Sequence, residues 1–340
     1  MSEFIANPWE VLETDFPAQG SSEEQLRFLL NYAVLAPSRM NTQPWLFRVD
    51  GRIVELYADR SKRLPTVDAD DRELTIGCGA ALENLLIAMR FFGYAPNVEI
   101  HSHPDQPDLL ARVSLDRGAA ATEEERLLFR AIQKRRTNRR LFNERKLAAA
   151  LLRALEVIAR QQGASFQVVP EQLRPNVVNL IAMADSLLWE KPAYRQELVA
   201  WVKHDRGGSR EGVPGNALGG EDLASSLGPP VLRTLIQNKE ESVHHVSSGS
   251  PVLAVISTFA DSWFDWLAAG RALEQILLRA CAGEVSASFF NQPIELASLR
   301  AELRGLLGRS GFPQLILRMG YGPEVPPTPR WGVNDRLLRS

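Results

Sequence analysis

The chain has 340 residues, of which 45% are apolar and 24% charged, and its formal net charge is −2. This composition is typical of a packed globular protein, and the length suits about two ordinary domains. The lack of excess positive charge argues against nucleic acid or an anionic membrane as a partner. With two cysteines and no apolar signal segment at the start, the sequence predicts a cytoplasmic protein. The apolar stretch 251–270 contains Asp261 and Asp265, so no span of a membrane is expected.

The first part of the chain combines helical and strand patterns. Ser21 and Glu24 resemble a capping box before a helix that must end near Pro37. A polar loop follows, and Asp50-Gly51 supplies the turn of a β-hairpin. We then expect an apolar helix over 77–94 and two strands, and these predicted strands cover residues 97–103 and 109–115.

From Thr122 the pattern begins again, with a charged amphipathic helix expected over 122–142. The further predicted helices cover residues 146–163, 177–190 and 270–283, and the predicted strands cover 165–170, 250–258 and 313–322. Residues 203–230 are rich in Gly, Pro and Ser, which favours a loop or lid over a core segment.

Two segments of the chain resemble each other. Residues 79–88 and 270–279 both begin with glycine and share Ala-Leu-Glu, an amide residue and an aliphatic run. Because the order of elements around each copy also agrees, the sequence predicts an internal duplication. The expected units are residues 1–121 and residues 122–340, with the lid inserted in the second.

Residues 36–45 read Ala-Pro-Ser-Arg-Met-Asn-Thr-Gln-Pro-Trp, between a helix end and a hairpin. Such a loop presents a hydroxyl, amides and backbone N–H groups, which can bind a polar heterocycle, or it can simply close turns. Residues 135–140 read Arg-Arg-Thr-Asn-Arg-Arg. A solvated basic face and a nucleic-acid patch are the other readings of that run, and the overall charge disfavours the second.

Together these two strings resemble the signatures of the nitroreductase family, and Gly320-Tyr321-Gly322 with Thr328-Pro329-Arg330 is similar to the family's C-terminal element. The string over 65–82 is similar to the Acg-like branch. The resemblance implies an α+β fold of two fused units, each a mostly antiparallel sheet packed with long helices, related by a pseudo-twofold axis. It implies FMN as cofactor and NADPH or NADH as the electron donor.

The resemblance also implies roles for particular residues. Arg135 and Arg330 would bind the phosphate, since guanidinium forks fix a dianion, and Thr137 would donate a hydroxyl. Arg139 would lie near the flavin pyrimidine, where a cation stabilises charge that builds up during reduction. The predicted cofactor-binding residues are Pro37, Ser38, Arg39, Asn41, Gln43, Arg135, Arg136, Thr137, Arg139, Ser288, Phe289, Thr328 and Arg330. Residues 286–292 could equally be an ordinary loop between helices.

The loop motif is found in the first unit and the arginine run in the second, so one chain is expected to build one composite FMN site. A monomer is possible because the paired units lie in one chain. The expected activity is NAD(P)H-dependent reduction of small electrophiles such as nitroaromatics or quinones, with no catalytic side chain because the flavin carries the chemistry. The alternative is an FMN-sequestering protein with a closed lid and no substrate.

Two weaker patterns are set aside. Gly77-Cys78-Gly79 has Leu82 where a dinucleotide fingerprint needs a third glycine. The five histidines have spacings that fit no zinc template, so no metal site is predicted.

Overall fold

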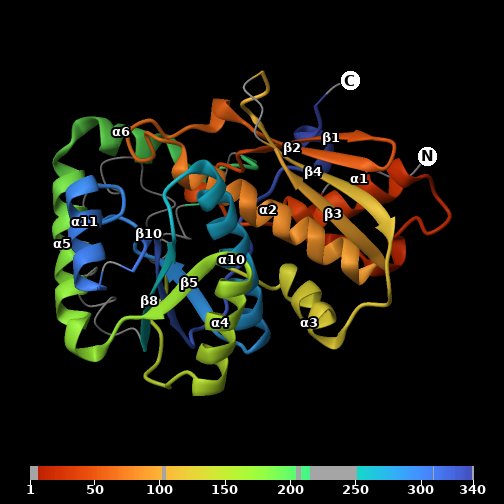
Figure 1. Ribbon diagram of the computed structural model, residues 1–340. Coiled ribbons are helices and arrows are strands. Elements are labelled where there is room, and N and C mark those ends of the chain that lie inside the picture. Colours follow the sequence, from red (N-terminus) through yellow and green to blue (C-terminus); the bar gives the residue numbers. More distant parts are fainter. Residues whose placement is uncertain (1–6, 102–104, 204–207, 215–250, 309, 339–340) are drawn as a thin grey trace.

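The computed structural model describes residues 7–101, 105–203, 208–214, 251–308 and 310–338. Two long helices, α2 (Arg72–Phe91) and α10 (Trp263–Ala282), lie side by side at its centre, with one sheet beyond each of them (Figure 1). Among the described helices, α2 is the one long and apolar enough to cross a membrane, and 89% of that apolar window is buried inside the fold.

The first sheet has the strand order β1-β2-β4-β3, with every neighbouring pair antiparallel. Its strands are β1 (Trp45–Asp50), β2 (Ile53–Ala58), β3 (Tyr94–Ile100) and β4 (Leu109–Arg117). One face packs on α1 (Ser22–Ala33) and α2, and the side chains of β3 alternate between half-buried and exposed. This sheet is therefore covered on one side, as alternating antiparallel strands usually are.

The second sheet has the order β5-β8-β10-β9, again antiparallel throughout. Its strands are β5 (Ala164–Val168), β8 (Val252–Thr258), β9 (Ser286–Phe289) and β10 (Phe312–Gly320). Alternate residues of β8 and β10 enter two separate apolar clusters, so both faces of this sheet are buried.

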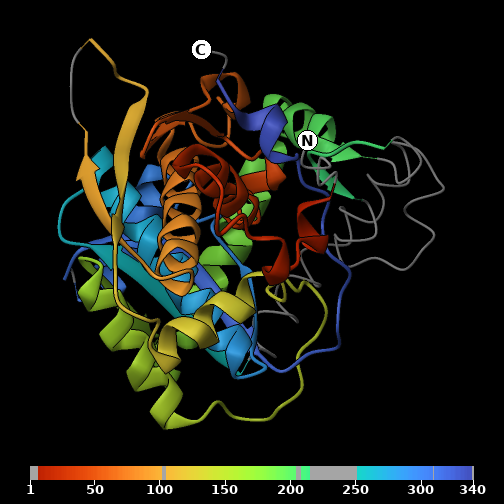
Figure 2. The same cartoon turned by 90° about the vertical axis from the view of Figure 1, so that its right-hand side faces the viewer.

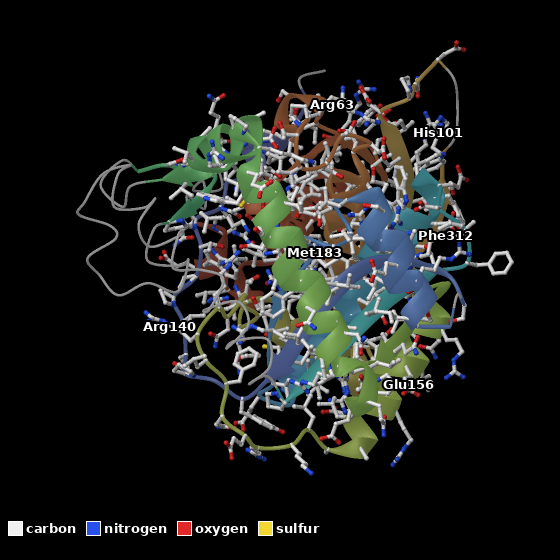
Figure 3. The ribbon with its side chains drawn as sticks, turned by 90° about the vertical axis from the view of Figure 1, so that its left-hand side faces the viewer. Arg63, His101, Arg140, Glu156, Met183 and Phe312 are labelled. Atoms are coloured by element: carbon white, nitrogen blue, oxygen red, sulfur yellow. The ribbon has the colours of Figure 1, made fainter. Side chains whose placement is uncertain are left out.

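Helices cover the second sheet on both sides. Figure 3 looks onto one of these helices, α5, which carries Met183. α5 and α11 share a cluster with one face, and α4 and α10 share a cluster with the other. The remaining bounds are α3 (Glu123–Ile132), α4 (Ala149–Gln161), α5 (Arg174–Glu190), α6 (Pro192–Trp201), α11 (Ala297–Leu306) and the parallel pair β6 (Val202–Lys203) and β7 (Val213–Pro214).

Local signals explain several boundaries. Ser21 caps α1 and exchanges hydrogen bonds with Glu24, as the sequence predicted. Gly51 takes a left-handed φ of 56° in the β1–β2 turn. The central helices begin earlier than expected, because Asp68 accepts hydrogen bonds from the first turn of α2, and Ser262 with Asp265 caps α10.

One expectation about local structure was wrong, and the structure excludes one of the two open readings of residues 286–292. The helix expected over 122–142 ends at Ile132, so the arginine run lies beyond it. The backbone of the run pairs with a distant strand and does not continue the helix, since Asn138 N donates to Ala287 O at 2.9 Å. Residues 286–289 are an edge strand, β9, instead of a loop between helices, because they pair with β10.

Candidate functional site

The loop that joins α1 to β1 has an unusual backbone. Met40, Asn41 and Gln43 have left-handed φ values of 49°, 56° and 52°, although none is glycine. Such residues cost on the order of 1–3 kcal/mol each and cluster at functional sites. The Ser38 hydroxyl accepts a hydrogen bond from Gln43 N at 2.9 Å, which stabilises the turn. Pro37 packs beside α2, where a Cβ atom added at Gly77 would lie 3.7 Å from the Pro37 carbonyl oxygen.

Two buried arginines from distant parts of the sequence meet at the start of this loop. Arg135 Nη2 donates to the carbonyl of Leu35 at 2.8 Å, and Arg330 Nη2 donates to the carbonyl of Ala36 at 3.1 Å. Leu35 and Ala36 lie in the turn that follows α1, where cations also interact favourably with the helix dipole. The two predicted phosphate ligands therefore converge on one point of the fold, where they also support the end of α1.

Arg330 is also the residue that ties the C-terminal tail to the loop. Its Nη1 atom donates to Asn41 Oδ1 and to Thr328 Oγ1, each at 2.5 Å. Its Nε atom is buried and has no hydrogen-bond partner among the described residues. One N–H of this buried guanidinium is therefore available to an anion.

The electrostatics of this corner are dominated by positive charge. Burial, then the charges of Arg135 and Arg136, hold the pKa of Arg330 well below its ordinary value, and Glu274 acts in the opposite direction. Burial, then the charge of Arg135, lowers the pKa of Arg136 to about 10. Glu274 lies 3.4 Å from Arg135 Nε, and burial raises the pKa of its carboxyl to about 7. Three guanidinium groups thus act on one another, whereas the one weakly acidic carboxyl, Glu274, acts on Arg135 and Arg330. This surplus of positive charge suits the binding of an anion.

The rest of the arginine run lies against the second sheet. Thr137 forms a bridge with Ala287, which places it next to the buried Ser288 and to Phe289 on β9. The predicted residues 137, 288 and 289 therefore lie close together.

A buried arginine of β10, Arg318, binds the backbone on both sides of Arg139. Arg318 Nη2 donates to the carbonyls of Asn138 at 3.0 Å and Arg140 at 2.8 Å, on both sides of Arg139. Burial, then the charge of Arg39, lowers the pKa of Arg139 to about 10. Arg140 is exposed and lies at the edge of the molecule (Figure 3).

Arg39 extends into a different group of charged residues. Its Nη2 atom lies 2.6 Å from Glu295 Oε1, and its Nε lies 3.4 Å from Glu73 Oε2. Burial, then the charge of Glu73, raises the pKa of Asp68 to about 6; burial, partly offset by Arg39, raises the pKa of Glu295 to about 8. Arg39 is therefore paired with Glu73 and Glu295, whereas Arg135 is paired with Glu274.

The side-chain amides of Asn41 and Gln43 are occupied by the protein itself. Asn41 Nδ2 donates to Gly212 O and Gln43 Nε2 donates to Arg210 O, at 3.0 and 2.7 Å. Gln43 Oε1 accepts from the backbone N–H of Trp331 at 2.9 Å. The described part of the expected lid, residues 208–214, is thus attached to the loop; residues 204–207 and 215–230 lie outside the described residues.

Sequence reasoning missed several participants. Trp9 contacts Thr328, Glu274 contacts Arg135, and Arg318 contacts the backbone on both sides of Arg139. No local pattern marks Trp9 or Arg318. A buried glutamate in an apolar helix was a usable signal for Glu274, because such a carboxylate needs a partner.

Comparison with known proteins agrees with the motifs. No protein-family model matches the chain. The chain is similar to a protein of Mycobacterium tuberculosis H37Rv, "Putative NAD(P)H nitroreductase Rv3131" (29% identity, covering 94% of this chain and 91% of that protein). It is also similar to "Putative NAD(P)H nitroreductase acg" (27%, covering 91% and 94%) and to "Uncharacterized protein Rv3127" (31%, covering 91% and 92%).

Among solved structures, the chain is similar to the FMN-dependent nitroreductase NfnB from Mycobacterium smegmatis in complex with NADPH. The identity is 16%, the TM-score is 0.43, and the match covers 63% of this chain and 98% of that one. From the sequence relatives, the chain belongs to the nitroreductase family and is related to Acg within it, which confirms the family that the loop and the arginine run indicated.

Proposed function

We propose that the chain is an FMN-binding oxidoreductase with one cofactor site built from both halves of the sequence. The convergence of Arg135 and Arg330 beside the left-handed loop carries this proposal. The orphaned Nε of Arg330 and the surplus of buried positive charge fit a phosphate monoester. When bound, FMN would supply hydride transfer, which protein side chains cannot perform.

The residues present suggest a division of labour. Arg135 and Arg330 would hold the phosphate, with the hydroxyls of Thr328 and Thr137 as further donors. Arg139 would place its charge at the pyrimidine edge of the ring, where negative charge develops on reduction. Its backbone is held on both sides by Arg318, which suits a cation that must keep a fixed direction.

We infer that the fold is a tandem duplication, with units at 1–121 and 122–340 related by a pseudo-twofold axis. The two sheets have the same strand order when β1, β2, β4 and β3 are matched to β5, β8, β10 and β9. The central helices are both 20 residues long and start 191 positions apart (263 − 72), the same offset as between Gly79 and Gly270 (270 − 79).

The duplication supports a single site. Eleven residues, 34–44, join α1 to β1, whereas two, Gln162 and Gly163, join α4 to β5. The second unit therefore has no equivalent of the loop that carries Asn41. One FMN per chain is expected, and the paired units make a monomer sufficient for function.

The proposed activity is reduction of small electrophiles such as nitroaromatics or quinones, with NADPH or NADH as donor. The names of two relatives, "Putative NAD(P)H nitroreductase Rv3131" and "Putative NAD(P)H nitroreductase acg", support this class. One observation favours the alternative, FMN sequestration: residues 210 and 212 accept hydrogen bonds from Gln43 and Asn41, so a segment of the chain lies against the loop.

Measurements on the purified protein distinguish reductase activity from FMN sequestration. Extraction and chromatography should give close to one FMN per chain, and addition of NADPH without oxygen should bleach the flavin absorbance. Bound FMN that no nicotinamide reduces would favour sequestration. A colourless protein that takes up no flavin would refute the proposal.

A further inference from the structure

We propose that Trp9 is a positioning residue for the phosphate-binding arginines, and that it sets the preference of the site for FMN over riboflavin. This inference rests on the proposed function. Trp9 lies in the N-terminal 3₁₀ turn Pro8–Glu10, far in sequence from every residue of the predicted site.

Three contacts join the Trp9 indole to that site. Its Nε1 donates to the carbonyl of Thr328 at 2.9 Å. The Cζ atom of Arg136 lies 4.1 Å from the centre of the Trp9 ring system, and that of Arg330 lies 5.3 Å from it. A single side chain therefore contacts the arginine run and the C-terminal tail, the two segments that would hold the phosphate.

The turn that carries Trp9 is itself fixed to the fold. The Asn7 side chain accepts a hydrogen bond from Trp9 N, which caps the turn. Gln133 Nε2, one residue after α3, donates to the carbonyl of Val11 at 2.8 Å. In Figure 2 the red N-terminal segment accordingly runs beside the blue C-terminal tail. Trp9 is thus held from two sides, as a positioning residue must be.

The physical reason for an aromatic residue here is the crowding of cations. Arg135, Arg136 and Arg330 repel one another, and burial adds to the cost of their charges. The face of an indole attracts a guanidinium by about 0.5–2 kcal/mol without neutralising it. A carboxylate in the same place would compete with an incoming phosphate for the arginines. Trp9 therefore stabilises the cations and leaves their charge for the ligand.

The phosphate dependence gives a sharp test. We would remove the flavin from the full-length protein and measure the affinity for FMN and for riboflavin, which share the ring and the ribityl chain. In Trp9→Leu the FMN affinity should fall on the order of tenfold, while the riboflavin affinity changes less than about twofold. Trp9→Phe, which keeps a ring and loses the N–H, should fall between Trp9→Leu and wild type. Trp266→Leu is the matched control, since this indole donates instead to Asp261 at 2.8 Å, and both affinities should persist.

The other outcomes are decisive as well. Equal losses for FMN and riboflavin would mean that Trp9 supports the fold or contacts the flavin ring, and would overturn the inference while the proposed function stands. Unchanged FMN affinity in Trp9→Leu would overturn it too. Wild-type protein that binds neither flavin would refute the proposed function and this inference with it.

Discussion

Gly79 and Gly270 meet where α2 crosses α10, and their surroundings are reciprocal. A Cβ atom added at Gly79 would lie 2.2 Å from the carbonyl oxygen of Leu267 and 3.0 Å from the Cα of Gly270. One added at Gly270 would lie 2.0 Å from the carbonyl oxygen of Ile76 and 2.9 Å from the Cα of Gly79. Leu267 lies three residues before Gly270, and Ile76 lies three residues before Gly79. Each helix therefore makes the same contact with the other.

This contact predicts that Gly79→Ala and Gly270→Ala separate the central helices. Each should lower the free energy of unfolding by about 3 kcal/mol, because a methyl group would overlap backbone atoms that cannot rotate away. Gly305→Ala in α11 is the control: nothing lies within 4 Å of its added Cβ, so alanine should stabilise slightly. Denaturant unfolding measures all three. Wild-type stability of Gly79→Ala would show that the helices can part at little cost.

The arginine corner predicts the effect of removing a phosphate ligand. Arg135→Ala and Arg330→Ala should each weaken FMN binding by on the order of 2–5 kcal/mol, as when a buried charge loses its partner. Arg140→Ala should do much less, because Arg140 is exposed. Flavin titration of the stripped variants measures this. If Arg135 and Arg330 serve α1 alone, the melting temperature will fall while the affinity of the folded fraction stays unchanged.

The raised pKa of Glu274 predicts a pH dependence of stability. Burial raises the pKa of the Glu274 carboxyl from 4.5 to about 7. The stability that Glu274 contributes is therefore complete below pH 4.5 and is lost as the pH rises through 7. Glu274→Gln should therefore gain stability relative to wild type between pH 5 and pH 8, by up to roughly 3 kcal/mol. The exposed Glu302→Gln should change little at any pH. A constant difference between Glu274→Gln and wild type would contradict the assignment.

The contacts of residues 208–214 predict how access to the site could be controlled. Glu211 accepts from Lys62 Nζ at 2.6 Å and from Trp331 Nε1 at 3.3 Å. Glu211→Gln should weaken this attachment by roughly 1 kcal/mol, about fivefold in the open population. NADPH should then reduce the flavin about fivefold faster in stopped-flow measurements. Arg48→Met, which removes an ion pair with Glu55 on the first sheet, should have no effect.

A rate that is the same in Glu211→Gln and wild type would mean that this segment does not limit access. Deletion of Arg206–Ser226, most of which lies outside the described residues, then provides the stronger perturbation. Faster reduction after the deletion alone would assign the limit to the rest of the expected lid.

Local chemistry made part of the fold and of the site predictable from sequence. The capping box of Ser21 and Glu24 and the turn at Gly51 depend on residues a few positions apart, so their pattern is visible in a single chain. The helix similarity between residues 79–88 and 270–279 likewise marked the two helices that form the centre. The loop and arginine motifs are continuous strings of residues, so they could be recognised in the sequence and indicated the nitroreductase family.

Tertiary structure alone decided where the arginines lie and in which direction their surroundings shift their pKa values. Local helical pattern favoured a helix over 122–142, yet pairing of Asn138 with Ala287 and of Arg135 with Leu35 ends it at Ile132. These partners are 149 and 100 positions apart (287 − 138 and 135 − 35). The contact between Trp9 and Thr328 spans 319 positions. Burial and long-range contacts set the pKa of Glu274, and neither is encoded in neighbouring residues, because both exist once the chain has folded.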